Sequence, residues 1–508
     1  MAVKLYSAQV VGLEGQIIDV EIDLSRGFSN FTIVGLPDKS VEESKERINA
    51  AIKNIGREYP QKRNQRVIVS LAPADLKKEG PVFDLAIALA YVMASGQTNF
   101  EPAGKIFLGE LALDGGLRPI KGALALALAA QSAGFKDIFL PKGNGQEAAL
   151  IKDINIYECL SLKEVLEHLE KTKMIAPTPE TQIKAQYSDS VLDISDIKGQ
   201  ETAKRGLEIA AAGGHNVLMT GPPGTGKTML AKILPSLLPP LSFEEVLEVT
   251  KIHSVAGTLD SAYLTLRPFR NPHHTSSYVS LVGGGAWPRP GEVTLAHRGV
   301  LFLDEFPEFE RRVIESLRQP LEDGFITVAR AKKSIRFPAR IMMVSAMNPC
   351  PCGNLGTKSK NCICSPSAIL KYKRKISGPI ADRFDLWLEV PQIEHEKLIQ
   401  KSQERQSVLI RNRVAKVRKI QKQRFEKAGR KILVNSEMNV KDIENLAGLA
   451  PKAQAALQQA AKNLDLSARA YHKVIKISRT IADLAESEGI EQNHVLEALQ
   501  YRPKQEDY

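Results

Sequence analysis

The sequence predicts an α/β protein whose central domain is built on a parallel sheet. Two apolar runs, at 217–220 and 300–303, each lead directly into a polar motif, as buried strands do at the edge of a parallel sheet. Residues before about 170 alternate strand-like and helix-like stretches, whereas those from 394 to 500 are helical. At 508 residues the chain is too long for one core, so we expect about three domains.

The first apolar run leads into a phosphate-binding loop. Residues 221–228 read G-P-P-G-T-G-K-T, which matches the pattern G-x-x-x-x-G-K-T between a strand and a helix. The glycines let backbone amides turn inward around a polyphosphate, and the helix N-terminus adds its positive end. Lys227 would reach the β- and γ-phosphates, and the Thr228 hydroxyl would bind Mg²⁺. The predicted nucleotide contacts of the loop are Gly221, Pro222, Pro223, Gly224, Thr225, Gly226, Lys227 and Thr228.

The second apolar run ends in two carboxylates, Asp304 and Glu305. Asp304 would hold the Mg²⁺ ion and completes the predicted nucleotide site, and Glu305 would polarise the attacking water. A core strand with two acids at its rim would look the same in isolation. Downstream of a complete phosphate loop, however, the acid pair predicts an ATPase that uses ATP and Mg²⁺.

Charge and composition limit the compartment and the partner. The net charge is +11, which favours a polyanionic partner such as nucleic acid. Eleven of the basic residues fall in 405–431 together with a single acid, on a segment whose apolar residues recur at helical spacing; a solvated helix face is the equal alternative. No apolar run is long enough to span a membrane, so we expect a cytoplasmic protein.

The stretch between the two nucleotide motifs is rich in glycine and proline, which predicts an inserted loop or hairpin. It contains the adjacent residues His273 and His274. A histidine pair can bind a metal ion, but no acid or cysteine stands at ligand spacing. Hydrogen bonding within the loop, or contact with phosphate, is therefore the favoured interpretation.

A second hairpin and a further strand follow the acid pair. Residues 325–340 read as two short strands, with Arg330, Lys332 and Lys333 at the turn. These cations would either grip a DNA backbone without sequence preference or remain solvated. Asn348 ends the next buried strand, where its amide would orient the water near the γ-phosphate.

Two arginines further on are candidates for phosphate contacts. Arg383 precedes an apolar strand, and from a neighbouring subunit its guanidinium would stabilise the transferring phosphoryl group. An ion pair of Arg383 with Asp382 or Asp385 is the alternative. Arg469 opens a long helix of the predicted lid and would be a second phosphate-sensing cation.

Four of the five cysteines form two C-x-C pairs separated by nine residues: Cys350, Cys352, Cys362 and Cys364. Two thiolate pairs around a short polar loop suit a tetrahedral Zn²⁺ ion. The pairs are tighter than the usual C-x₂-C spacing, so free thiols are the alternative interpretation.

The N-terminal region resembles the proteolytic domain of Lon proteases in the order of three short motifs, at 71–75, 79–84 and 116–122. That family has a nucleophilic serine directly after Gly-Pro and a lysine base on a later helix. Here Val82 takes the place of the serine, and Leu124 aligns with the lysine. Because a valine cannot attack a carbonyl, the resemblance implies a Lon-like α+β fold without peptidase activity.

Over nearly its full length the chain resembles the ComM/YifB family of magnesium-chelatase-like AAA+ ATPases. The most specific stretches are 271–275, 288–305, 350–353 and 466–483. The resemblance implies a homo-hexameric ring with ATP sites between subunits. It also implies that Arg383 acts on the site of a neighbouring subunit, and that Asn348 and Arg469 are the two phosphate sensors.

The resemblance further implies an ATP-driven DNA helicase that promotes branch migration of recombination intermediates, as in natural transformation. A magnesium-chelatase-type motor that remodels a protein partner is the alternative. The expected architecture is an AAA+ P-loop core with a parallel sheet, a Lon-protease-like domain and a helical lid. The expected boundaries are 1–170 for the Lon-like domain, 171–190 for a linker, 191–392 for the ATPase core with a Cys-rich insert at 350–364, and 393–508 for the lid.

Overall fold

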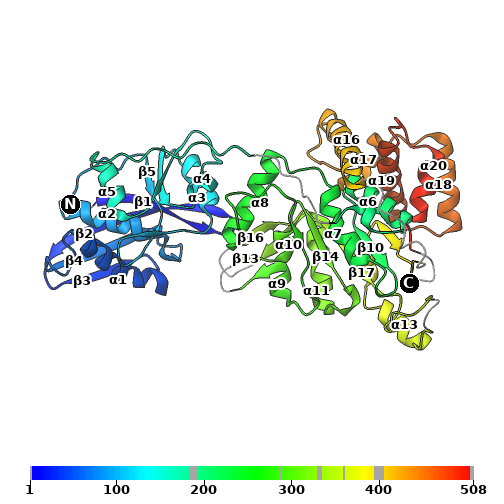
Figure 1. The fold of residues 1–508 in the computed structure, drawn as a ribbon, viewed down its shortest axis with the longest axis horizontal. Coiled ribbons are helices and arrows are strands. Elements are labelled where there is room, and N and C mark those ends of the chain that lie inside the picture. The colour runs from blue at the N-terminus through cyan, green and yellow to red at the C-terminus, as the bar shows by residue number, and fades with distance from the viewer. Residues whose placement is uncertain are drawn as a thin grey trace. The chain divides into compact units, whose positions relative to one another are not determined.

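The computed structural model describes residues 3–183, 192–285, 288–328, 334–357, 361–393 and 405–503. The chain is divided into two compact units, and Figure 1 labels many of their elements. Unit 1 joins residues 1–184 with Phe243–Leu264, and unit 2 contains residues 185–242 and 265–508. Strands and helices are mixed in both units, which confirms the predicted α/β class. No helix within the described ranges is both long and apolar enough to cross a membrane.

Unit 1 is an α+β domain whose described residues form a four-stranded sheet, a three-stranded sheet and a two-stranded hairpin. The larger sheet has the order β1-β2-β4-β3, in which only β3 and β4 run parallel, and the smaller parallel sheet has the order β5-β8-β9. The strands are β1 (Val3–Val11), β2 (Glu14–Arg26), β3 (Asn30–Val34), β4 (Gln65–Ala72), β5 (Lys105–Phe107), β8 (Asp137–Pro141) and β9 (Asn155–Cys159), with a short hairpin of β6 (Glu110–Leu111) and β7 (Leu117–Arg118). The helices are α1 (Lys39–Asn54), α2 (Asp84–Ala94), α3 (Ala123–Ser132), α4 (Gly145–Ala148), α5 (Leu162–Leu169) and α8 (Phe243–Ala256).

Helix α8 belongs to unit 1, although in the sequence it lies between the two nucleotide motifs. Its buried residues Val246, Val249 and Ile252 recur at helical spacing and form one apolar face. At its C-terminal end the Ser254 hydroxyl accepts a hydrogen bond from the Gly122 amide at 2.9 Å, at the start of α3. The chain thus leaves unit 2 after residue 242, completes the packing of unit 1, and returns at residue 265.

The positions that correspond to the Lon serine and lysine lie in an apolar cluster of unit 1. Leu124 is fully buried there, and Val82 packs against the same cluster. Leu247 on α8 and Tyr263 after α8 also pack against it. Both side chains therefore contribute to the hydrophobic core of unit 1.

Unit 2 is built on a five-stranded parallel sheet with the order β11-β14-β17-β10-β18. The strands are β11 (Phe269–Arg270), β14 (Val300–Leu303), β17 (Met342–Met347), β10 (Val217–Thr220) and β18 (Leu386–Glu389). All residues of β14 and β17 are buried, as expected for parallel strands covered on both faces. Two short hairpins accompany the sheet, β12 (Gly283–Gly284) with β13 (Arg289–Pro290) and β15 (Phe325–Val328) with β16 (Ile335–Pro338).

The helices of unit 2 include α6 (Glu201–Gly213) and α7 (Lys227–Leu237) on either side of β10 in the sequence. Two short helices follow the acid pair, α11 (Arg311–Ser316) and α12 (Arg318–Asp323), separated at Leu317. The remaining helices of the sheet region are α9 (Tyr278–Val282), α10 (Glu292–Leu295), α13 (Pro366–Lys373) and α14 (Gly378–Ala381). The C-terminal helices, gathered beside α6 in Figure 1, are α16 (Gln406–Lys427), α17 (Val440–Leu446), α18 (Pro451–Asn463), α19 (Ala468–Leu484) and α20 (Gln492–Gln500).

Helix α16 carries most of the basic segment that the sequence singles out. Its apolar face, which includes Val414 and Phe425, is buried in the core that it shares with α6, α7 and α19. Much of its positive charge is neutralised within unit 2, since Arg413 pairs with Glu208 at 2.7 Å and Lys416 with Glu486 at 2.6 Å. The cations of this helix therefore contribute less to a free basic surface than their number indicates.

Candidate nucleotide-binding site

The site lies where three neighbouring strands of unit 2 end. Strand β17 lies between β10 and β14 in the sheet, and all three run in the same direction. Thr220 and Met347 are paired in register, so that the phosphate loop and Asn348 begin at the same level. A hydrogen bond from the Gly221 amide to the Met347 carbonyl, at 3.2 Å, joins the two strand ends. The parallel sheet therefore brings polar residues from distant parts of the chain to one edge.

Two kinds of glycine shape the phosphate loop. Gly224 and Gly226 have φ angles of +77° and +93°, a region that residues with a Cβ atom rarely adopt. At Gly221 the restriction is space, because an added Cβ would lie 2.1 Å from the Val390 carbonyl oxygen. Helix α7 begins at Lys227, so its N-terminal amides face the loop.

Lys227 is held inside the loop. The residue is 8% exposed, and its Nζ donates hydrogen bonds to the carbonyl oxygens of Gly221 (2.6 Å) and Pro222 (2.8 Å) and to Asn348 Oδ1 (3.2 Å). Burial lowers the pKa of the ammonium group, and the nearby Asp304 carboxylate opposes that shift. Phosphate oxygens are stronger acceptors than the loop carbonyls, so the residue fits a triphosphate ligand.

The predicted magnesium ligands face each other. The Thr228 hydroxyl donates to Asp304 Oδ2 at 2.9 Å, and the Glu305 amide donates to Asp304 Oδ1 at 3.0 Å. A hydroxyl and a carboxylate are hard oxygen donors of the kind that Mg²⁺ binds through one or two protein ligands. This donor set fits a magnesium ion at the mouth of the phosphate loop.

Glu305 has a partner that the sequence analysis missed. Its backbone adopts a left-handed conformation with φ +50°, and its carboxylate lies 3.1 Å from His274 Nδ1. His273 instead bonds within its own loop, with Nδ1 2.9 Å from the Thr275 hydroxyl. The signal that could have revealed this pair is the position of His274 just after β11, the strand that neighbours β14.

The two arginines predicted as phosphate contacts form pairs elsewhere within the single chain. Arg383 donates to Glu322 Oε2 at 2.5 Å rather than pairing with Asp382 or Asp385. Arg469 is 61% exposed, with its Nη1 3.8 Å from Asp382 Oδ2. The structure thus does not bring either guanidinium into hydrogen-bond contact with the phosphate-loop residues that it describes.

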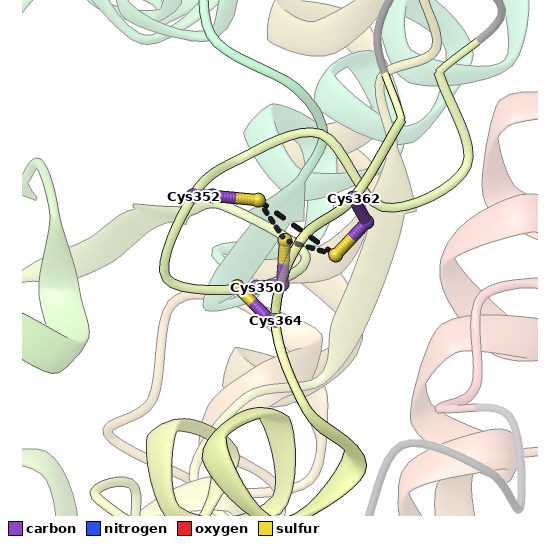
Figure 2. Close-up of side chains that lie close together, drawn as sticks. All are labelled: Cys350, Cys352, Cys362 and Cys364. Carbon is purple, nitrogen blue, oxygen red and sulfur yellow. Dashed lines mark hydrogen bonds between the residues drawn. The ribbon is translucent and has the colours of Figure 1, made fainter.

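The four clustered cysteines come together directly after Asn348. Their sulfur atoms all lie within 4.8 Å of one another, and Figure 2 shows them turned toward a common centre. The backbone amides of Asn354 and Ile363 lower the pKa of the Cys352 thiol to about 6. The three predicted DNA contacts Arg330, Lys332 and Lys333 lie in residues 329–333, outside the described residues.

Comparison with protein families matches most of the chain to three magnesium-chelatase models. Residues 193–398 match "Magnesium chelatase, subunit ChlI", residues 20–144 match "Subunit ChlI of Mg-chelatase", and residues 404–502 match "Magnesium chelatase, subunit ChlI C-terminal". The chain is 44% identical over 506 residues to the competence protein ComM of Haemophilus influenzae, which covers 98% of this chain and 97% of that protein.

Two further relatives bear on the fold and on the family. The protein YifB of Escherichia coli is 41% identical over 503 residues, covering 98% of this chain and 96% of YifB. A Lon protease of Mycolicibacterium smegmatis is 29% identical over 140 residues, covering 27% of this chain and 18% of the protease, in agreement with the Lon-like resemblance. The chain therefore belongs to the ComM/YifB family of magnesium-chelatase-like AAA+ ATPases.

Proposed function

We propose that the protein is a cytoplasmic, hexameric DNA motor whose ATP hydrolysis drives branch migration of recombination intermediates, as in natural transformation. The observation that carries the ATPase part is the 2.9 Å contact between Thr228 and Asp304, because it assembles a magnesium-binding pair beside the phosphate loop. The DNA part is supported by the similarity to a competence protein over 98% of the chain and by the net charge of +11.

In this proposal each residue of the site has a separate task. The cofactors would be ATP, which supplies the phosphoryl group, Mg²⁺, which supplies a divalent charge, and Zn²⁺, which the cysteine cluster would hold. Lys227 would exchange its carbonyl partners for phosphate oxygens, and Thr228 and Asp304 would hold the magnesium ion. Glu305 would accept a proton from the attacking water, which Asn348 would orient.

Two arginines and one turn complete the proposed motor. Arg383 would act on the site of a neighbouring subunit after leaving Glu322, and Arg469 would sense the nucleotide from the helical lid. The turn with Arg330, Lys332 and Lys333 would contact the phosphate backbone of DNA without reading its sequence.

A chelatase-type motor that remodels a protein partner is the second candidate, and the three magnesium-chelatase matches favour it. The two candidates share the same ATPase site. They differ in the partner that stimulates ATP hydrolysis, since only the DNA motor would respond to nucleic acid.

The experiment that separates them measures ATPase rate with no DNA and with single-stranded, duplex, three-way and four-way branched DNA, using Glu305→Gln as the blank. Stimulation by branched or single-stranded DNA, falling steeply as salt rises, is expected because phosphate contacts release counterions. Replacing Lys332 and Lys333 by alanine should reduce the stimulation without changing the basal rate. Hydrolysis that is indifferent to every DNA would contradict the DNA motor and favour the chelatase-type motor.

A further inference from the structure

The four sulfur atoms of the cysteine cluster have the spacing of a single metal site. The Sγ atoms of Cys350 and Cys352 are 3.5 Å apart, those of Cys350 and Cys362 are 3.6 Å apart, and those of Cys352 and Cys362 are 3.7 Å apart. A tetrahedral ion with Zn–S bonds of about 2.3 Å requires sulfur atoms about 3.8 Å apart. A multi-iron cluster would hold the sulfur atoms farther apart, because each iron takes its own thiolate.

Hydrogen bonding around the cluster also suits thiolates. The Leu355 amide donates to Cys350 Sγ at 3.3 Å, a contact that stabilises a bound thiolate and fixes its direction. Four negative thiolates at these distances would repel one another unless a cation lay between them. All four cysteines are free of disulfide bonds, so the thiols are available for a metal ion.

The cluster is joined directly to the nucleotide site. Asn348, which accepts a hydrogen bond from Lys227, stands two residues before Cys350. Gly353 has φ +79°, and a Cβ atom added to it would lie 2.8 Å from Pro223 Cδ in the phosphate loop. The turn between the cysteine pairs therefore packs against both the phosphate loop and the residue proposed to orient water.

The chain also returns to Asn348 after the cluster. Helix α13 begins two residues beyond Cys364, and its buried residue Tyr372 faces the Asn348 backbone amide. Burial raises the pKa of Tyr372 to about 12, and a hydrogen bond from that amide opposes the shift. Both ends of the cysteine loop thus converge on the same residue of the nucleotide site.

We propose that Cys350, Cys352, Cys362 and Cys364 bind one structural Zn²⁺ ion, and that this ion positions Asn348 and the phosphate loop for hydrolysis. With four thiolate ligands the ion has no open position, so it acts through geometry rather than by binding water. The positioning role rests on the proposed ATPase activity, whereas the metal site does not. Asn348 would lose its position without the ion, and a displacement of 1 Å near reacting atoms can cost about a hundredfold in rate.

The metal is tested on the full-length protein by elemental analysis and by thiol titration. We expect about one zinc ion per chain, released when a mercurial reagent modifies the four clustered thiols. Cys364→Ser should lower the zinc affinity by at least about tenfold, whereas Cys159→Ala should retain zinc. Burial raises the pKa of the Cys159 thiol, which keeps this fifth cysteine unreactive in the titration. Metal-free protein with four reactive thiols would overturn the site, and bound iron would overturn the choice of zinc.

The positioning role is tested with two glycine variants that leave all four ligands in place. Gly353→Ala should retain zinc but lower kcat by about tenfold or more, because the added methyl group presses on Pro223. Gly356→Ala is the matched control, since Gly356 has the similar φ of +77° but nothing within 4 Å of its added Cβ. Equal kcat values for the two variants, with zinc retained in both, would overturn the positioning role.

A final measurement uses the wild-type chain, so its result does not depend on the folding of any variant. Zinc is removed from the wild-type chain and titrated back, and kcat and nucleotide affinity are followed together. We expect kcat to fall and recover with the zinc content, while the nucleotide dissociation constant changes far less. Hydrolysis that continues unchanged without zinc would refute the coupling. These readouts use no DNA, so failure of the DNA-motor proposal would leave them interpretable.

Discussion

The carboxylate of Glu305 lies 3.1 Å from His274 Nδ1. Glu305, the residue proposed to activate water, is therefore in contact with a neighbouring side chain. A carboxylate in contact with a histidine nitrogen is less free to accept a proton from water. The contact is partly exposed, and pairs of this kind contribute up to about 1 kcal/mol, equivalent to about fivefold in rate.

We therefore expect His274→Ala to raise the basal ATPase rate by about two- to fivefold. His273→Ala is the matched control, since His273 bonds to Thr275 in the same loop and should leave the rate near that of the wild type. A steady-state assay without DNA measures both variants. A fall in the rate of His274→Ala would show that the histidine supports Glu305 rather than restraining it.

Replacing Lys227 by alanine removes the buried ammonium group of the phosphate loop. Charged hydrogen bonds contribute about 1.5–3 kcal/mol, so nucleotide binding should weaken by about 10- to 100-fold and turnover should become undetectable. Lys232→Ala, an exposed lysine on the same helix, serves as the control and should bind normally. Normal hydrolysis by Lys227→Ala would contradict the assignment of the site.

Arg383→Ala should leave nucleotide binding nearly intact while kcat falls by about a thousandfold or more, the scale of losing an arginine that acts on the phosphoryl group. Mixing Arg383→Ala chains with Lys227→Ala chains should restore activity, because random mixing in a ring leaves roughly a quarter of the sites with both groups. The absence of any rescue would argue against action across subunits.

Opening of the Arg383–Glu322 pair is tested separately, since the arginine must leave Glu322 before it reaches another subunit. Glu322→Gln removes one charge of the pair and should raise the ATPase rate by about fivefold or less, in line with partly exposed ion pairs. Because Arg383 would then be free to contact a neighbouring subunit, the ATPase rate of Glu322→Gln should also fall less steeply than that of the wild type when the protein is diluted. An unchanged dilution profile would count against such a restraint.

Asp483 is a buried carboxylate in the helical part of unit 2. Asp483 pairs with Arg479 and Arg424 and accepts a hydrogen bond from Asn435, and both Asp483 and Arg479 are almost fully buried. Asp483→Ala leaves the Arg479 charge without its partner, and we expect a loss of about 3–5 kcal/mol in the free energy of unfolding. Glu486→Ala, which removes an exposed pair with Lys416, should cost less than about 1 kcal/mol in denaturant titrations.

The residues of the candidate ATPase site could be found from the sequence because each motif is local. The phosphate loop and the acid pair each occupy a few consecutive residues at the end of a strand, and their residue types are suited to binding phosphate and magnesium. The α/β class followed from buried strands that alternate with helices. The prediction that Val82 and Leu124 cannot form a peptidase dyad rests in the same way on residue identity alone.

The tertiary structure decided how distant segments meet. Helix α8 lies between the nucleotide motifs in sequence but packs in unit 1, because its apolar face fits that core. The contact of His274 with Glu305 depends on two neighbouring strands, and the pair of Arg383 with Glu322 joins residues with no sequence pattern in common. The sequence predicted a helix with a broad basic face at 405–431, whereas the structure pairs Arg413 and Lys416 of helix α16 with carboxylates. Residue types thus determine which chemistry is available, whereas packing determines which groups reach one another.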